Sequence, residues 1–254
     1  VEDPDDLVIY ELLLRDFTEN GGKEGNLEGA LAKLDYLETL GINAIELMPI
    51  QEFDGNDSWG YNPNSYFALD KAYGTRDMYK KFIDECHKRG MAVLFDVVYN
   101  HATGNFPHAK LYWDEANNKT AENNPFFNVD APHPYSVFHD FNHEYSETRT
   151  YFKRMLKYWL EEYKIDGFRF DLAKGLTQRQ SDEGSCSNYD ASRIAIIKDY
   201  ADAIRSVSDD AYIILEHFAD YWEENELASY RNILLWNNQT NGFYQTVMGY
   251  SGSD

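Results

Sequence analysis

Gly167-Phe-Arg-Phe-Asp171 combines a short apolar run with a carboxylate at its end. Such a run, bounded by polar residues, is typical of a buried strand. Two other runs share the pattern, since residues 91–98 carry Asp96 near their end and residues 211–216 end on Glu216. The sequence therefore predicts three strands whose carboxyl ends each present an acidic side chain.

Strands and amphipathic helices alternate on both sides of this stretch. Further strands are predicted over residues 8–14, 42–50 and 233–236. Helices are predicted over residues 27–40, 75–89, 152–159, 194–204 and 221–230, from apolar residues at helical spacing. Asn26 is expected to cap the first helix and Gly41 to end it. This alternation indicates a parallel sheet, either doubly wound or closed as a barrel.

The acidic strand ends favour the barrel. A barrel brings the carboxyl ends of all its strands around one axis, whereas a doubly wound sheet spreads them in a row. No glycine-rich phosphate loop follows the first strand, which argues against a nucleotide-binding fold. We therefore predict an α/β fold of the TIM (β/α)8 barrel type. About six of the eight β/α units are expected in these 254 residues, with the first and sixth strands unpaired at their outer edges.

Residues 102–145 interrupt the alternation. They are rich in Asn, His, Pro and aromatic residues, show no sustained periodicity, and are too many for a simple loop between a strand and a helix. We expect residues 1–101 and 146–254 to form the partial barrel and residues 102–145 to form a small insertion after its third strand.

The composition excludes several kinds of partner. The chain has 23 Lys and Arg against 44 Asp and Glu, and its net charge of −21 repels phosphate backbones and anionic lipids. No apolar run approaches the roughly 20 residues that span a bilayer, and the opening residues do not resemble a signal peptide. We expect a soluble protein without nucleic-acid partners or membrane insertion, in a compartment that the sequence leaves open. Aromatic residues make up 16% of the chain, and their flat apolar faces suit sugars.

Four motifs together resemble the α-amylase family of retaining α-glucan glycosidases and transglycosylases. Three match signature regions of its catalytic domain: Asp96-Val-Val-Tyr-Asn-His101, Gly167-Phe-Arg-Phe-Asp171 and Leu215-Glu216. The fourth, Trp59-Gly-Tyr-Asn-Pro63, resembles the corresponding loop of pullulanase-like, isoamylase-like and branching-type members. The motifs occur in the family's order and spacing over residues 8–250, so the resemblance is specific.

This resemblance implies that Asp171 is the nucleophile and Glu216 the general acid/base, acting through a covalent glycosyl-aspartate. A retaining mechanism needs these two carboxyl groups about 5 to 5.5 Å apart, a separation that neighbouring strand ends in a barrel can provide. Arg169 lies two residues before Asp171 and therefore on the same side of the strand. Its cation is expected to keep Asp171 ionised and oriented.

The same resemblance assigns His101, Tyr61 and Trp59 to substrate binding. His101 is expected to hydrogen-bond a hydroxyl of the sugar that is cleaved, and Tyr61 to offer a stacking face. Residues 102–145 fall where the family inserts its small B domain and would wall one side of the glucan cleft. The expected partner is therefore an α-glucan oligosaccharide or polysaccharide.

Two further residues are expected to be structural. Asp96 is expected to bond Arg169 and its neighbours rather than to take part in the chemistry. Asn100 matches a position that binds structural calcium in many family members, and a hydrogen bond that fixes its loop is the plain alternative. No cofactor is expected to be required.

The chain also departs from the family pattern. Gly175 stands after Lys174 where many amylases have histidine, which favours a pullulanase-like debranching enzyme over an endo-amylase. The family's His-Asp pair after strand seven, the source of its third carboxylate, is expected beyond Asp254, so the chain is expected to be truncated and inactive by itself. A branching-type transglycosylase and a non-catalytic glucan-binding fragment remain alternatives. The preference for α-1,4 or α-1,6 bonds stays open.

Overall fold

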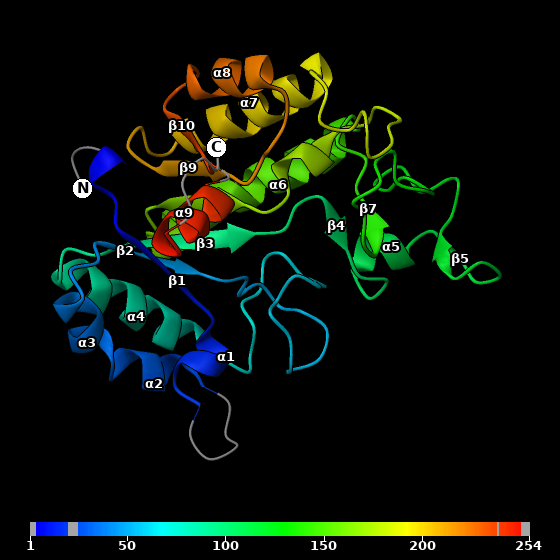
Figure 1. Ribbon diagram of the computed structural model, residues 1–254. Helices are drawn as coiled ribbons and strands as arrows, with labels where there is room; N and C mark the ends of the chain where they lie inside the picture. Colours follow the sequence, from blue (N-terminus) through cyan, green and yellow to red (C-terminus); the bar gives the residue numbers. More distant parts are fainter. Residues whose placement is uncertain (1–3, 20–24, 238, 250–254) are drawn as a thin grey trace.

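A parallel sheet forms the centre of the molecule in a computed structural model (Figure 1), which describes residues 4–19, 25–237 and 239–249. Residues 1–3, part of the opening in which no signal peptide was expected, lie outside this description. The strands are β1 (Ile9–Leu12), β2 (Ala44–Leu47), β3 (Ala92–Val97), β8 (Gly167–Phe170), β9 (Tyr212–Leu215) and β10 (Ile233–Leu235). All six predicted strands are therefore present.

The order of the strands confirms the predicted fold class. They lie in the sheet as β1-β2-β3-β8-β9-β10, which is also their order along the chain, and every neighbouring pair is parallel. A doubly wound sheet reverses its strand order at a switch point, whereas a (β/α)8 barrel adds strands in sequence. The sheet is thus a partial barrel with β1 and β10 at its edges.

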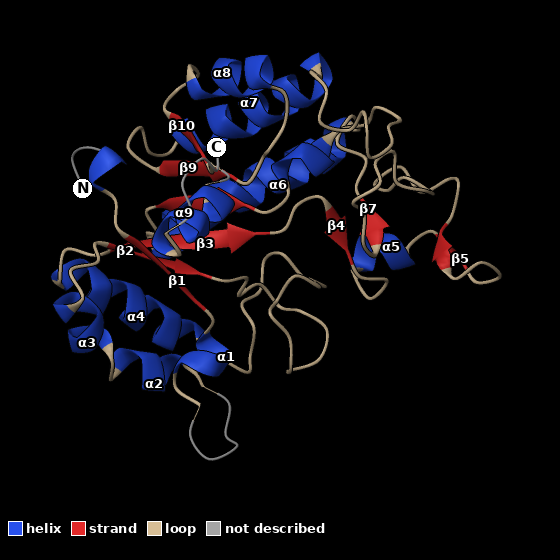
Figure 2. Ribbon diagram, viewed as in Figure 1, coloured by secondary structure: helices blue, strands red, loops and turns tan. Residues whose placement is uncertain are grey.

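Helices cover the outer side of the sheet (Figure 2). The predicted helices correspond to α4 (Arg76–Lys88), α6 (Ser146–Tyr158), α7 (Ala191–Arg205) and α8 (Tyr221–Ala228). The side chain of Thr75 accepts a hydrogen bond at the start of α4, and Asp190 caps α7 in the same way. A π-helical turn, η2 (Trp159–Tyr163), extends α6. None of the described helices has the length and apolar character needed to cross a membrane.

The single helix predicted over residues 27–40 is wrong. The structure has two short helices there, α2 (Leu27–Leu31) and α3 (Leu34–Thr39). Asn26 caps α2 through Gly29 N, as expected. Gly29 itself lowers the helix propensity of this first turn. Tertiary burial of the leucines then fixes both pieces against the barrel without a continuous helix.

The first predicted strand also ends early, because Leu14 begins α1 (Leu14–Phe17) rather than continuing β1. Three other short helices are present, namely η1 (Pro4–Asp6), η3 (Ala173–Leu176) and α9 (Thr240–Val247). The segment after β3 contains α5 (Pro107–Lys110) and two small antiparallel ribbons. The ribbons pair β4 (His101–Ala102) with β7 (His139–Asp140), and β5 (Trp113–Asp114) with β6 (Lys119–Thr120).

The two faces of the sheet differ in composition because successive side chains of a strand point to opposite faces. The outer face packs Phe95 of β3 and Phe168 of β8 into the main apolar cluster, together with residues of the helices. The inner face has a much smaller apolar cluster: Ala44, Ala92, Leu94, Tyr212 and Ile214. Charged residues continue this inner face toward the carboxyl ends of the strands.

Candidate active site

The predicted acidic residues meet at the carboxyl end of the inner face. Asp96 lies in β3 and pairs in register with Arg169 of β8, the next strand in the sheet. Asp171 follows β8 directly, and Glu216 follows β9. Because Arg169 and Asp171 are two residues apart in extended backbone, their side chains lie on one face.

Arg169 connects the three carboxylates. Its Nη1 donates hydrogen bonds to Asp96 Oδ1 at 2.7 Å and to Asp171 Oδ1 at 3.1 Å. Its Nη2 donates to Glu216 Oε2 at 2.8 Å. The guanidinium also lies over the ring of Trp236, 4.3 Å from the ring centre. One cation thus binds acidic side chains from three neighbouring strands. Two of these contacts, with Asp171 and with Asp96, were predicted from the sequence.

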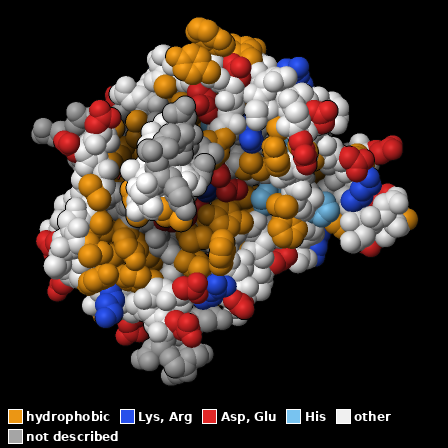
Figure 3. All heavy atoms as spheres, viewed as in Figure 1, with side chains coloured by type: hydrophobic (Ala, Val, Ile, Leu, Met, Phe, Trp, Pro, Cys, Tyr) orange, Lys and Arg blue, Asp and Glu red, His pale blue; other side chains and the backbone are white. Residues whose placement is uncertain are grey.

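Exposure divides these four side chains into two pairs. Asp96 is 0% exposed and Arg169 is 4% exposed, so neither presents appreciable surface to a ligand. Asp171 is 17% exposed and Glu216 is 27% exposed. The carboxylates of Asp171 and Glu216 can therefore reach a substrate, while Asp96 and Arg169 support them from below. Figure 3 shows acidic and basic side chains at the centre of this face, beside hydrophobic and histidine side chains.

Burial and charge act on these groups in opposite directions. Burial raises the pKa of Asp171 to about 6, with Arg169 opposing the shift and Glu216 adding to it. Burial also opposes the charge of Arg169, but its bound carboxylates outweigh burial and raise the pKa of Arg169 above its ordinary value. The arginine therefore stays charged, and Asp171 is mostly ionised at neutral pH.

The backbone after Asp171 locks β8 and β9 together. Leu172 has a φ of 42°, in the left-handed region that a bulky side chain rarely adopts. In this conformation Leu172 N donates to Glu216 Oε2 at 3.1 Å, and Ala173 N donates to Glu216 O at 2.7 Å. The strained turn therefore holds Glu216 next to Asp171 through both its side chain and its main chain.

Tyr61 and His101 extend the network. Tyr61 donates its hydroxyl hydrogen to Asp96 Oδ2 at 2.7 Å, and its carbonyl oxygen lies 2.8 Å from His101 Nε2. Burial lowers the pKa of His101 to about 4, so the ring is neutral at pH 7. Since a carbonyl only accepts hydrogen bonds, His101 carries its single proton on Nε2. Trp59, which is 59% exposed, is not part of the network that the described residues form around Arg169.

Asn100 is fully buried beside His101, with its Oδ1 atom 2.8 Å from His101 Nδ1 and its Nδ2 atom unpartnered. A neutral His101 that donates through Nε2 has only a lone pair at Nδ1. Exchanging the amide oxygen and nitrogen of Asn100 would give that lone pair a donor and leave a buried, unpartnered carbonyl oxygen. Such an oxygen fits calcium, although it supplies one of about six to eight ligands that Ca²⁺ takes.

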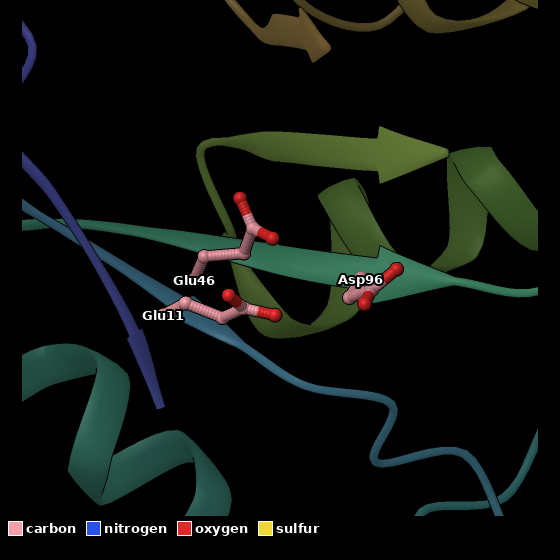
Figure 4. A group of neighbouring side chains, drawn as sticks. All are labelled: Glu11, Glu46 and Asp96. Carbon is pink, nitrogen blue, oxygen red and sulfur yellow. The ribbon is translucent and has the colours of Figure 1, made fainter. Parts of the chain in front are cut away.

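A second acidic group on the inner face escaped the sequence analysis. Carboxylate oxygens of Glu11, Glu46 and Asp96 lie within 4.8 Å of one another (Figure 4). Burial raises the pKa of Glu46 to about 7, and one of its oxygens has no hydrogen-bond partner. Both oxygens of Asp96 are already bonded, to Arg169 and Tyr61. Glu46 was detectable in principle, because it is the one charged residue of the predicted strand 42–50.

A buried ion pair behind Glu216 also escaped the sequence analysis. Arg193 of α7 donates from Nε to Glu223 Oε1 of α8 at 2.6 Å, and His217 Nε2 lies 2.7 Å from the same oxygen. Burial alone would raise the pKa of Glu223, but the hydrogen bonds from His217 and Arg193 lower it to about 2. Arg193 Nη1 also donates to the carbonyl of Lys174. The network thus connects the segments that follow Asp171 and Glu216, a long-range contact that no local pattern signals.

Comparisons of the sequence with known proteins give one family match and several named relatives. Residues 12–137 and 133–241 match the family described as "Alpha amylase, catalytic domain". The malto-oligosyltrehalose trehalohydrolase of Saccharolobus solfataricus is 37% identical over 175 residues, which are 68% of this chain and 28% of that protein. The chloroplastic isoamylase SU1 of Zea mays is 36% identical over 201 residues, covering 68% of this chain and 25% of that protein. The chain thus spans about a quarter of the length of these relatives.

Solved protein structures superpose on most of this chain. Amy13B of Eubacterium rectale superposes with a TM-score of 0.73 at 26% identity, covering 95% of this chain and 50% of that chain. The glycogen-degrading pneumococcal virulence factor SpuA superposes with a TM-score of 0.61 at 27% identity, covering 84% of this chain and 23% of that chain.

Proposed function

Because the chain belongs to the alpha-amylase family, we propose that Asp171 and Glu216 form the reacting pair of a retaining α-glucan hydrolase. Asp171 attacks the anomeric carbon and forms a glycosyl ester, while Glu216 gives its proton to the leaving oxygen. Glu216 then takes a proton from water, whose oxygen displaces Asp171 from the sugar. The observation that carries this proposal is the shared guanidinium of Arg169, which binds both partly exposed carboxylates at neighbouring strand ends.

The charges around the pair support these roles. Attack requires an ionised Asp171, and the bond from Arg169 favours that form against the effect of burial. Glu216 has the larger exposed fraction of the two, which suits a group that must reach a leaving oxygen and then water. Asp96 holds Arg169 in place from the buried side and does not touch substrate.

We assign Tyr61, Trp59 and His101 to substrate binding. Both ring nitrogens of His101 lie against protein atoms, Tyr61 O and the Asn100 amide. Binding to a sugar hydroxyl therefore requires that hydroxyl to replace the carbonyl of Tyr61 as the acceptor of the Nε2 proton. Residues 102–145 would act as a B-domain-like wall of the cleft, and Asn100 would contribute one oxygen to a structural calcium ion, which is not a required cofactor.

We place hydrolysis ahead of transglycosylation because the relatives include proteins named isoamylase and trehalohydrolase. We favour debranching over endo-amylase action because this chain has Gly175 where many amylases have histidine. A Cβ atom on Gly175 would lie 3.2 Å from Asn100 Cβ and 3.3 Å from Leu172 Cδ2, tighter than ordinary contact. A histidine at this position would require its neighbours to move. A branching-type transglycosylase would use the same covalent intermediate with a sugar as the acceptor.

A covalent trap tests the proposal directly. The full-length protein is incubated with a fluorinated α-glucosyl fluoride, which forms the glycosyl ester faster than water removes it, and its peptides are analysed by mass spectrometry. We expect a glycosyl mass on the peptide that contains Asp171, and none in the variant Asp171→Asn. A label on another carboxylate would overturn the assignment, as would an unlabelled protein that also releases no reducing ends from pullulan or maltoheptaose. Product analysis with maltoheptaose separates hydrolysis from chain transfer.

A further inference from the structure

Phe138 adopts an unfavourable backbone conformation at an exposed position. Its φ of 56° lies in the left-handed region, which costs a bulky residue on the order of 1 to 3 kcal/mol. The residue remains 56% exposed, so burial of its ring offsets little of that cost. A conformation that is both strained and poorly buried points to a use other than packing.

The position of Phe138 suggests what this use is. Its ring centre lies 5.6 Å from that of His101, at an angle of 37° between the ring planes. Phe138 directly precedes β7, which pairs with β4, the strand that carries His101. From His101 a continuous path of contacts leads through Tyr61 and Asp96 to Arg169. Phe138 therefore stands at the rim of the candidate active site.

Neighbouring contacts tie the segment around Phe138 to a second element of the site. Tyr135 lies three residues before Phe138, and Lys174 Nζ lies 4.8 Å from the centre of its ring. Lys174 belongs to η3, which begins two residues after Asp171. Residues 135–138 are thus fixed at both ends to elements of the site, by His101 on one side and by the segment after Asp171 on the other.

We infer that Phe138 is a stacking platform for a glucosyl unit of the substrate next to the bond that is cleaved. The C–H face of a pyranose is apolar and flat enough to cover an exposed phenyl ring. The left-handed backbone presents the ring beside His101. This inference rests on the proposed function and adds a binding residue that the family motifs of the sequence did not indicate.

Three variants of Phe138 separate a platform from a packing residue. Affinity of the full-length protein for maltoheptaose is measured by titration calorimetry in an Asp171→Asn background, which prevents turnover, and stability by urea unfolding. Phe138→Ala should weaken binding about 3- to 10-fold, and Phe138→Tyr should keep it. Phe138→Gly should weaken binding similarly while leaving the protein at least as stable, because glycine adopts a positive φ without strain. Leu111→Ala, a change at a 65% exposed residue of the same segment, is the matched control and should not change affinity.

The outcomes separate a role of Phe138 in binding from the proposed function of the protein. If the Asp171→Asn protein binds maltoheptaose and Phe138→Ala binds it equally well, the platform is wrong and the proposed function stands. A loss of stability in Phe138→Gly would likewise identify a packing residue and overturn the inference. If neither the Asp171→Asn protein nor the wild type binds any α-glucan, the proposed function fails, and the platform fails with it.

Discussion

On β8, Phe168 and Phe170 face the helices, whereas Arg169 and Asp171 face the inside of the partial barrel. The two phenylalanines are buried in the large apolar cluster. Arg169 instead binds carboxylates of β3 and β9 as well as Asp171. Residues that alternate along one strand therefore meet different demands, close packing outside and balanced charge inside. Substitutions on the outer face should therefore lower the free energy of unfolding, whereas substitutions on the inner face should lower the rate of catalysis.

Asp171→Asn should have the largest effect on the inner face. Without the attacking oxyanion, no glycosyl ester forms, and kcat of the full-length protein on maltoheptaose should fall by at least about 1,000-fold. Its free energy of unfolding at pH 7 should not fall, because the amide removes a partly buried charge. Steady-state kinetics and urea unfolding check both parts. A variant that loses stability as well as activity would show that the inner face also carries the fold.

Glu216→Gln tests the second carboxylate through the leaving group. Turnover of maltoheptaose by the full-length protein should fall about 100- to 10,000-fold, the usual contribution of general acid catalysis. An activated aryl glucoside needs little protonation, so its glycosylation rate should fall much less. Pre-steady-state measurement of aryl alcohol release gives this rate. Equal losses on both substrates would rule out Glu216 as the general acid.

Phe168→Ala tests the outer face. Removing a fully buried phenyl ring from the main cluster should lower the free energy of unfolding by about 3 to 5 kcal/mol. Phe168→Leu removes fewer buried atoms, should cost less than Phe168→Ala, and serves as the control. Urea unfolding followed by tryptophan fluorescence measures both. Phe168→Ala protein that remains folded should keep its pH profile of activity, because Phe168 does not touch the carboxylates.

The pH dependence gives the smallest and most specific effect. The pKa of Asp171 is raised in the folded state to about 6, so its contribution to stability is present below about pH 4 and is lost as the pH rises toward 6. Activity should change in the opposite direction, rising through about pH 6 as Asp171 ionises. Asp171→Asn should lack this part of the stability profile.

Glu46 supplies the comparison for that measurement. Its pKa of about 7 predicts a second loss of stability between about pH 4.5 and 7, which Glu46→Gln should remove without abolishing turnover. Unfolding curves of both variants and of wild type are measured across pH 4 to 8. The difference from wild type shows which loss of stability belongs to Asp171 and which to Glu46. A stability profile that neither variant changes would contradict the raised pKa values.

Local patterns predicted much of the fold. Apolar runs located all six strands, and the polar strand ends correctly favoured the barrel. The helix over residues 27–40 was wrong because leucine periodicity indicates which residues are buried, and two short helices bury Leu27, Leu34 and Leu37 without a continuous helix. Helix continuity depends on contacts that periodicity does not contain.

The candidate site was predictable where one strand carries several of its residues. Arg169 and Asp171 share a face by the two-residue repeat, so their contact followed from the sequence. The Arg193–Glu223 pair joins two helices, and the backbone of Phe138 depends on the pairing of β4 with β7. Neither feature has a local signal. The roles of Asp171, Glu216 and the substrate-binding residues stay predictions that the experiments above decide.

The sequential strand order determines when each strand can pair during synthesis of the chain. A ribosome releases about 5 to 20 residues per second, and most strands of this sheet can pair with the strand made just before them. β8 is the exception, because its partner β3 is made much earlier: residues 98–166 must be synthesised before β8 emerges, a delay of roughly 3 to 14 seconds. During this delay Asp96 lacks Arg169, its eventual partner. An unneutralised carboxylate on the waiting edge of β3 would discourage a second nascent chain from pairing there.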